Sequence, residues 1–300
     1  METIELVKVL LTGSSGFLGQ EILKKLLAKN HKVLGLDISK GLINHKNFKF
    51  FKTDLKKKAS INIKEKYDVA IHTAAIQPFK KDENFKKYID GNLITGQNFF
   101  DIAINLGIKK FIICSSFSVY GKTKKYIHER ENLNPKNFYG LSKKFLENLA
   151  EYYHNNYNIN VIILRFDGIF GQNQNLPGFI RMVIKNAILN KKIVLFNSGK
   201  LKRDYVYVED AADSIILSLK KIDKYKFDVF NIGSGFPKTN LKITKTIVRY
   251  LDSKSKVEVI KNKNKNFNQD IFMNINRAKK KLKFKPKKLI NNLKKIEFKN

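Results

Sequence analysis

Residues 7–19 read VKVLLTGSSGFLG, an apolar run that passes directly into a segment with three glycines. The run is short and partly β-branched, which predicts a buried parallel strand. Residues 20–29 then carry apolar side chains at helical spacing, and residues 32–36 form a second apolar run that ends at Asp37. This pattern predicts a strand–helix–strand unit with a glycine turn between the first strand and the helix.

The glycine turn has the composition of a phosphate-binding turn. Gly13 lets the chain reverse tightly, Gly16 lets the backbone approach a pyrophosphate, and Gly19 lets the helix pack on the strand. The free N–H groups at the start of the helix then face the phosphates. Asp37 lies 18 residues after Gly19, where a carboxylate accepts hydrogen bonds from an adenosine ribose. Glycine turns also occur in domains that bind nothing, but here the strand, the helix and the terminal acid occur together.

The composition is that of a globular protein without a membrane span. The chain has 300 residues, 43% of them hydrophobic, enough for one large α/β unit or for a large and a smaller domain. No run of about 18 apolar residues occurs, and residues 1–5 lack the basic start of a signal peptide. Cys114 is the only cysteine, which excludes an intrachain disulfide and indicates a reducing compartment. We therefore expect a cytoplasmic protein that does not bind membranes.

The charge is strongly basic. Lysine and arginine total 59 against 26 aspartate and glutamate residues, a formal net charge of +33. Only six of the cations are arginines, and the 53 lysines are spread along the whole chain. Sequence-specific nucleic-acid recognition favours the bidentate guanidinium, so the lysines indicate a solvated surface with weak, non-specific attraction to polyanions. We predict no specific nucleic-acid partner.

A second motif follows the fifth predicted strand, residues 110–114. Ser116 lies just after this strand, and Tyr139 and Lys143 open a segment with helical apolar spacing. Four residues apart, Tyr139 and Lys143 share a helix face. A tyrosine, with an ordinary pKa of about 10, acts in acid–base catalysis near neutrality only beside a cation that stabilises its phenolate. Lys143 can supply that charge, and Ser116 can donate to the same substrate oxygen.

Together these motifs resemble the extended short-chain dehydrogenase/reductase family, and within it the NAD-dependent epimerases and dehydratases. Four further segments match that family's pattern in order: DVAIHTAA at residues 68–75, NLITGQN at 92–98, RDYVYVED at 203–210 and NIGSG at 231–235. The resemblance implies an α/β fold, with a doubly wound parallel sheet of the Rossmann type in residues 1–170. It also implies a smaller α/β substrate domain in residues 171–300, interleaved with the first.

The resemblance further implies NAD as the cofactor and a nucleotide-activated sugar as the substrate. It assigns catalytic roles to Ser116, Tyr139 and Lys143, and substrate contacts to Ser116 and Arg203. His72 is interpreted as structural, and no metal site is predicted. The residues expected to bind NAD are Gly13, Ser15, Gly16, Phe17, Leu18, Gly19, Asp37, Asp54, Leu55, Ala74, Ala75, Asn92, Tyr139 and Lys143.

Arg203 has two interpretations. In an arginine-poor chain, a guanidinium ahead of the Asp-Tyr motif is a candidate for gripping a nucleotide diphosphate with two hydrogen bonds. The alternative is a structural salt bridge to Asp204 or Asp210, because arginines commonly pair with carboxylates.

Two of the family's phosphate contacts are missing from the sequence. Gly168 occupies the position where relatives usually carry an Asn that contacts substrate phosphate. Residues 267–270 read FNQD, beginning at Phe267, where an Arg is usual. Lys263 or Lys265 could replace that arginine as a point charge.

The segment after the fifth strand separates the family's reactions. Sugar 4,6-dehydratases usually carry Thr-Asp-Glu there and use the acids to eliminate water, whereas this chain has Ser116-Phe117-Ser118. A Ser–Tyr–Lys set alone is sufficient for reversible hydride transfer at a secondary alcohol. We therefore predict 4-epimerisation of a nucleotide-activated hexose through a 4-keto intermediate.

Two alternatives stay open. A nucleotide-sugar 4-ketoreductase needs the same residues but exchanges its NAD(P)H at each turnover. The charge of Asp37 argues against it by repelling a 2′-phosphate, although Lys40 is close enough to weaken that argument. A non-catalytic, dinucleotide-sensing protein that binds polyanions would account for the net charge but not for the Tyr139–Lys143 pair. Relatives commonly dimerise through two helices per subunit, here residues 92–106 and 139–155, so we expect a homodimer.

Overall fold

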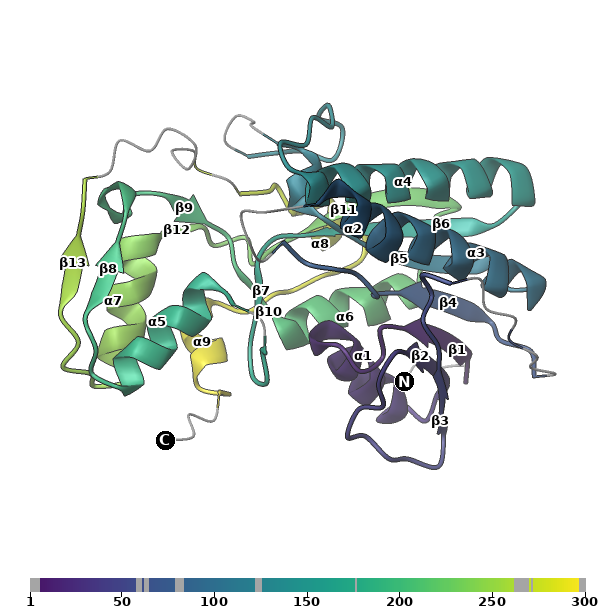
Figure 1. Ribbon diagram of the computed structural model, residues 1–300, viewed down its shortest axis with the longest axis horizontal. Coiled ribbons are helices and arrows are strands. Elements are labelled where there is room, and N and C mark those ends of the chain that lie inside the picture. Colours follow the sequence, from purple (N-terminus) through teal and green to yellow (C-terminus); the bar gives the residue numbers. More distant parts are fainter. Residues whose placement is uncertain are drawn as a thin grey trace.

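The computed structural model describes residues 6–57, 61, 65–78, 84–121, 126–175, 177–261, 270 and 272–296. In the ribbon view the chain forms a larger part around one sheet and a smaller part beside it (Figure 1). No helix within the described ranges is both long enough and apolar enough to cross a membrane.

Seven parallel strands form the central sheet, in the order β11-β6-β5-β4-β1-β2-β3. Their bounds are β1 Lys8–Thr12, β2 Lys32–Asp37, β3 Phe48–Lys52, β4 Val69–His72, β5 Lys110–Ser116, β6 Asn160–Phe166 and β11 Phe227–Ile232. The order reverses between β1 and β4, so the loops after these strands diverge and leave a crevice at the carboxyl edge of the sheet. The prediction of a doubly wound Rossmann-type sheet is confirmed.

Both faces of this sheet are buried because side chains alternate across each strand. Val9 and Leu11 of β1 join a core with helices on one face, whereas Leu10 between them joins the core on the other. The first face carries α1 Phe17–Leu27, α6 Val208–Leu219 and α8 Asn276–Lys281, and the second carries α3 Thr95–Asn105 and α4 Phe138–Tyr157. These two cores fix the sheet between two layers of helices.

The smaller part lies at the left of Figure 1 and has an apolar core of its own. Its helices are α5 Phe179–Ile188, α7 Asn240–Tyr250 and α9 Leu289–Leu293. Its short strands pair as β8 Ile193–Leu195 with β13 Val257–Val259, and as β9 Lys202–Arg203 with β12 Lys238–Thr239. Between the two parts, β7 Ile169–Phe170 pairs with β10 Val206–Tyr207.

The chain passes more than once between the two parts. After β10 it returns to the large sheet as α6 and β11, then leaves again for α7 before α8 packs on the sheet's first face. The central sheet therefore contains a strand from the last third of the sequence.

The helix expected over residues 92–106 starts earlier and is not regular. Helix α2 Phe85–Tyr88 runs through a π-helical turn, η1 Ile89–Ile94, before α3 begins. A Cβ atom on Gly91 would lie 2.2 Å from Cδ1 of Ile76, so the absence of a side chain lets this wide turn sit against the loop after β4. Single-turn π segments often occur beside functional sites, and this one places Asn92 next to that loop.

A buried polar network joins helix α4 to the sheet. The Glu147 carboxylate accepts from the Arg165 guanidinium at 2.6 Å (Nη2) and 3.0 Å (Nε) and from the Ser115 hydroxyl. Arg165 also donates to the Tyr120 hydroxyl, which in turn donates to the Asn231 side chain. Both members of the ion pair are about 5% exposed. The network therefore connects helix α4 to strands β5, β6 and β11.

Replacing Glu147 by Gln would leave the Arg165 guanidinium buried without a counter-charge. We expect the Glu147→Gln variant to lose about 3–5 kcal/mol of unfolding free energy in urea denaturation. Glu151→Gln, on the exposed side of α4 one turn later, is the matched control and should change stability by no more than about 0.5 kcal/mol. Equal losses in the two variants would show that the buried pair stabilises the fold no more than a surface charge does.

Candidate active site

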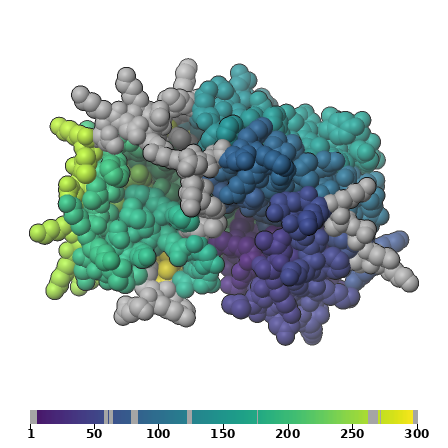
Figure 2. Space-filling model, in the orientation of Figure 1, coloured from purple at the N-terminus to yellow at the C-terminus, as the bar shows by residue number. Residues whose placement is uncertain are grey.

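One cavity of about 760 Å³ opens at the carboxyl ends of the strands. Its walls come from the glycine turn, the ends of β2 and β3, the loops after β4, β5 and β6, the start of α4, and α5 with the segment before it. In the space-filling view, the green segment around α5 faces the purple and blue N-terminal half across the middle of the molecule (Figure 2). The volume suits a small-molecule or cofactor site.

The glycine turn is as tight as the sequence predicts. Gly13 has φ +69°, and a Cβ atom there would lie 2.7 Å from the Ala74 nitrogen. A Cβ atom on Gly19 would lie 1.9 Å from the Gly13 carbonyl oxygen, so α1 can pack on the turn only with glycine at that position. The turn residues predicted to bind NAD, namely Gly13, Ser15, Gly16, Phe17, Leu18 and Gly19, all line the cavity.

Asp37 lines the end of the cavity beside this turn. Its Oδ2 accepts from the Ser15 N–H at 3.0 Å, and its Oδ1 accepts from the Ile38 N–H at 2.7 Å. Asp54 and Leu55, predicted to bind NAD, also line the cavity, as do Ala74 and Ala75. The glycine cradle, an anchored carboxylate and small residues together form a lining that can hold a dinucleotide.

Tyr139 lies at the other end, 5% exposed at the start of α4. Burial raises the pKa of Tyr139 to about 12, and the polar side chains of Ser116 and Gln77 beside its hydroxyl act in the opposite direction. All three residues line the cavity, so the structure brings the predicted Ser116–Tyr139 pair together.

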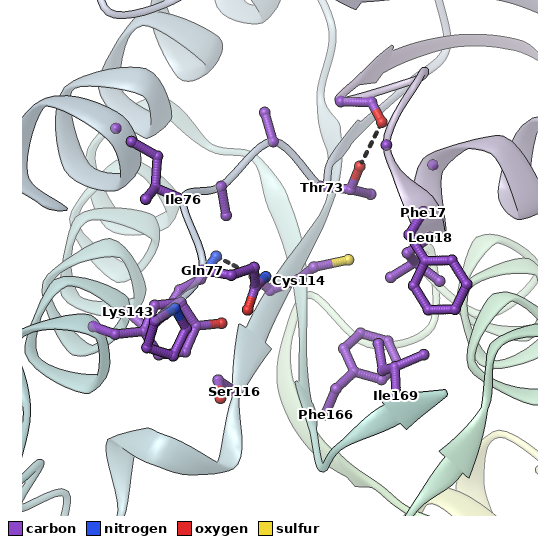
Figure 3. Close-up of a pocket in the computed structure, with 18 of the residues that line it drawn as sticks. Phe17, Leu18, Thr73, Ile76, Gln77, Cys114, Ser116, Lys143, Phe166 and Ile169 are labelled. Carbon is purple, nitrogen blue, oxygen red and sulfur yellow. Dashed lines mark hydrogen bonds between the residues drawn. The ribbon is translucent and has the colours of Figure 1, made fainter. Parts of the chain in front are cut away.

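Lys143 follows one turn later on α4 and lines the cavity as well. Its Nζ donates to the main-chain carbonyl of Cys114 at 3.0 Å. Burial lowers the pKa of Lys143 to about 8, while the Glu147 carboxylate acts to raise it. The ammonium is therefore cationic at neutral pH, on the helix face it shares with Tyr139. Figure 3 shows Lys143, Gln77 and Ser116 on one side of the cavity, and Phe17, Leu18, Phe166 and Ile169 on the other.

Gln77 is one of the cavity residues that sequence reasoning missed. It lies two residues beyond Ala75, in the loop that follows β4, and its side chain acts to lower the pKa of Tyr139. The signal that could have identified it is its place after a strand of the central sheet, since ligands of such sheets bind at the carboxyl ends of strands.

Asn92 and Arg203 do not line the cavity, although both were predicted to contact ligands. Asn92 is fully buried: its Oδ1 accepts from the Ile76 N–H at 2.7 Å, and its Nδ2 donates to the Ser142 hydroxyl at 2.9 Å. It thus braces the loop that presents Gln77. Arg203 lies on β9, close enough to act on the charge of the Asp167 carboxyl.

Of the two positions where the sequence lacks a phosphate contact of the family, the structure describes only Gly168. Gly168 lines the cavity, and a Cβ atom there would lie 2.7 Å from the Tyr205 ring. That ring therefore fills the space where a longer side chain would start. Lys263, Lys265 and Phe267 lie outside the described residues.

His72 is placed away from the cavity lining, at the end of β4. Its Nδ1 is 2.8 Å from the Thr12 hydroxyl, and its ring packs on Phe99. Burial lowers the pKa of His72 to about 3, so the imidazole is neutral at physiological pH. This environment agrees with a structural role.

Comparison with known proteins identifies the fold family. The sequence profile of the NAD dependent epimerase/dehydratase family matches residues 9–233. The chain belongs to this family. Its membership confirms the predicted extended short-chain dehydrogenase/reductase type and the prediction that the chain is an NAD-dependent enzyme.

Individual members of the NAD dependent epimerase/dehydratase family show what this chain is similar to. The UDP-glucuronate 4-epimerase of Thermodesulfobacterium geofontis is 28% identical, covering 92% of this chain and 90% of that protein. The dTDP-D-glucose 4,6-dehydratase of Dictyostelium discoideum is 31% identical over 80% of this chain, which spans 61% of its length. The crystal structure of the UDP-glucuronic acid 4-epimerase from Bacillus cereus with NAD has a TM-score of 0.84 at 25% identity, covering 95% of each chain.

Removing the carboxylate of Asp37 should relax the preference for NAD over NADP. We expect Asp37→Ser to raise the affinity for NADP relative to NAD by about tenfold, because a carboxylate near a 2′-phosphate costs roughly that much at protein surfaces. Equilibrium titration of both cofactors measures the ratio. Asp54→Ser, two residues after the end of β3, is the control: it should change the two affinities equally. An unchanged ratio in Asp37→Ser would remove Asp37 from the ribose site.

Proposed function

We propose that this protein is an NAD-dependent 4-epimerase of a nucleotide-activated hexose, acting through a 4-keto intermediate. The observation that carries the proposal is the Tyr139 hydroxyl, which lies beside Ser116 inside the cavity, one turn before a buried Lys143. Membership in the NAD dependent epimerase/dehydratase family supports it, as do the epimerases among its relatives.

The residues of the chain divide the chemistry among them. When bound, NAD supplies the hydride acceptor and donor for C4 of the sugar. Tyr139 takes the proton from the C4 hydroxyl and later returns it, while Ser116 holds the same oxygen. The Lys143 charge favours the phenolate form of Tyr139. Burial raises the pKa of Tyr139 to about 12, so this cationic support is what the reaction needs near neutrality.

Dehydration is disfavoured by the same wall of the cavity. Ser116, Phe117 and Ser118 all line it, and none of them carries the acid that would protonate a departing hydroxyl. An epimerase also keeps its cofactor from one turnover to the next, whereas a reductase must exchange it. Mass spectrometry of the nucleotide released on denaturation separates the two: stoichiometric NAD(H) supports the epimerase, and an empty protein supports a 4-ketoreductase.

We also propose a homodimer formed through α3 and α4, in a cytoplasmic protein whose residues 1–170 bind NAD and whose residues 171–300 bind the sugar nucleotide. The two helices pack side by side, with Phe100 stacked on Tyr153, and α4 exposes Tyr152 and Tyr157. Light scattering should give twice the mass of the chain, and a monomer at micromolar concentration would remove the dimer from the proposal.

Arg203 is proposed to act on the substrate's diphosphate.

The decisive variant is Tyr139→Phe, which removes one oxygen from the site. We expect a loss of turnover of at least about a thousandfold with UDP-hexoses, because the C4 proton then has no acceptor, while NAD affinity changes by less than about threefold. Tyr152→Phe, exposed on the same helix, is the matched control and should keep full activity. Turnover retained in Tyr139→Phe would reject the assignment.

A further inference from the structure

Asp167 is a buried carboxyl on the cavity wall that the proposed chemistry does not use. It lines the cavity and is 4% exposed. Its Oδ1 accepts from the Gly168 N–H at 2.7 Å, whereas its Oδ2 has no hydrogen-bond partner among the described residues. Burying an oxygen without a hydrogen-bond partner costs free energy, so Asp167 Oδ2 is a candidate to accept a hydrogen bond from a bound ligand.

Asp167 lies nearer to the end of the cavity proposed for the sugar than to the end proposed for the adenosine of NAD. Phe166, the residue before it, is the register partner of Ser116 on the adjacent strand. Neighbouring strands lie about 4.8 Å apart, so Asp167 begins one residue beyond the strand position opposite Ser116. A sugar whose C4 hydroxyl reaches Ser116 and Tyr139 therefore has its other ring substituents near Asp167.

Three ionisable groups act on the Asp167 carboxyl: Asp204, Arg203 and Tyr205. Burial and the Asp204 carboxylate raise the pKa of Asp167 to about 7, against the opposing effect of Arg203. The Asp204 carboxylate has a structural role, since it accepts hydrogen bonds from the Ser234 and Gly235 N–H groups at 3.0 and 2.9 Å. The charge on Asp167 therefore changes within the physiological range of pH.

Arg203 lies near Asp167 outside the cavity lining and is assigned to the substrate's diphosphate, so little remains to hold a second anion at this end. Among the described residues that line the cavity, the only cationic side chains are Lys56, beside Asp54, and Lys143. Lys143 is already directed at the Cys114 carbonyl. A carboxylate on the sugar ring would thus approach Asp167 in a space shielded from water, where repulsion between like charges is stronger than in solution.

We propose that Asp167 selects hexoses without a ring carboxylate, whose hydroxyl or amino substituents donate to its free oxygen, and rejects hexuronic acids. This inference rests on the proposed function and names the substrate class of the same site. It separates this chain from the relatives that act on glucuronic acid. Specificity here comes from a repulsive group placed against the wrong substrate.

The test compares the binding of UDP-glucose and UDP-glucuronic acid, which differ only at C6, to the NAD-loaded full-length protein by calorimetry. The dissociation constant for UDP-glucuronic acid, divided by that for UDP-glucose, should rise about tenfold between about pH 6 and pH 8.5 as Asp167 ionises. In Asp167→Asn, which keeps the size of the side chain, the ratio should be low and independent of pH. Asp223→Asn, exposed at the opposite edge of the sheet beside Lys110, should behave as wild type.

Each outcome decides a different point. A ratio in the wild type that is flat with pH and equal to that of Asp167→Asn overturns the role of Asp167 and leaves the epimerase proposal intact. If neither nucleotide sugar binds, the proposed function fails and this inference fails with it. Should Asp167→Asn not fold, the pH series of the wild type decides alone, because the glucuronate carboxylate stays ionised throughout.

Discussion

The buried ion pair between Glu147 and Arg165 fixes helix α4 against strand β6. Lys143 and Tyr139 lie about one and two turns before Glu147 on the same helix face, so the pair determines where both reach the cavity. Ser115, the register partner of Arg165 on the next strand, bonds the same carboxylate. The residue after it is Ser116. One carboxylate thus positions the phenol, the ammonium and the hydroxyl relative to one another.

A buried ion pair is an expensive way to join elements, because both charges lose water. Here the cost is offset by hydrogen bonds around the guanidinium, which also donates to the Tyr120 hydroxyl and the Glu129 carbonyl. An apolar contact would allow helix and strand to slide, whereas paired directional bonds allow one register. The arrangement suits a site in which the hydroxyl of a tyrosine must meet that of a serine from another element.

The parts of the site that sequence predicts are those set by local geometry. The glycine turn and the Tyr139–Lys143 pair each depend on spacing within one turn or helix, and both are found as expected in the cavity. Gln77 and the partners of Glu147 were not predictable in this way, since their contacts join residues far apart in the sequence. Asn92, expected among the residues that bind NAD, hydrogen-bonds the backbone of Ile76, a contact that residue type alone does not reveal.

The fold, like the site, has features that local sequence patterns predict and features that depend on residues distant in the sequence. The βαβ unit follows from local periodicity, because β1 and β2 are short apolar runs on either side of a helix. The π-helical turn before α3 and the pairing of short strands such as β7 with β10 depend on neighbours distant in sequence. Tyr205 covering Gly168 is another example: the sequence shows a missing Asn, and only the packing shows that an aromatic ring occupies its place.

The position of β11 affects how the chain is made. Strand β6 ends at Phe166, but its outer partner begins at Phe227. During synthesis the ribosome must therefore produce the intervening segment while one edge of β6 has open N–H and C=O groups, the kind of edge that pairs with other chains. The unpaired edge of β6 stays exposed in the nascent protein for as long as that synthesis takes. A pause within residues 167–226 would prolong the exposure of this edge.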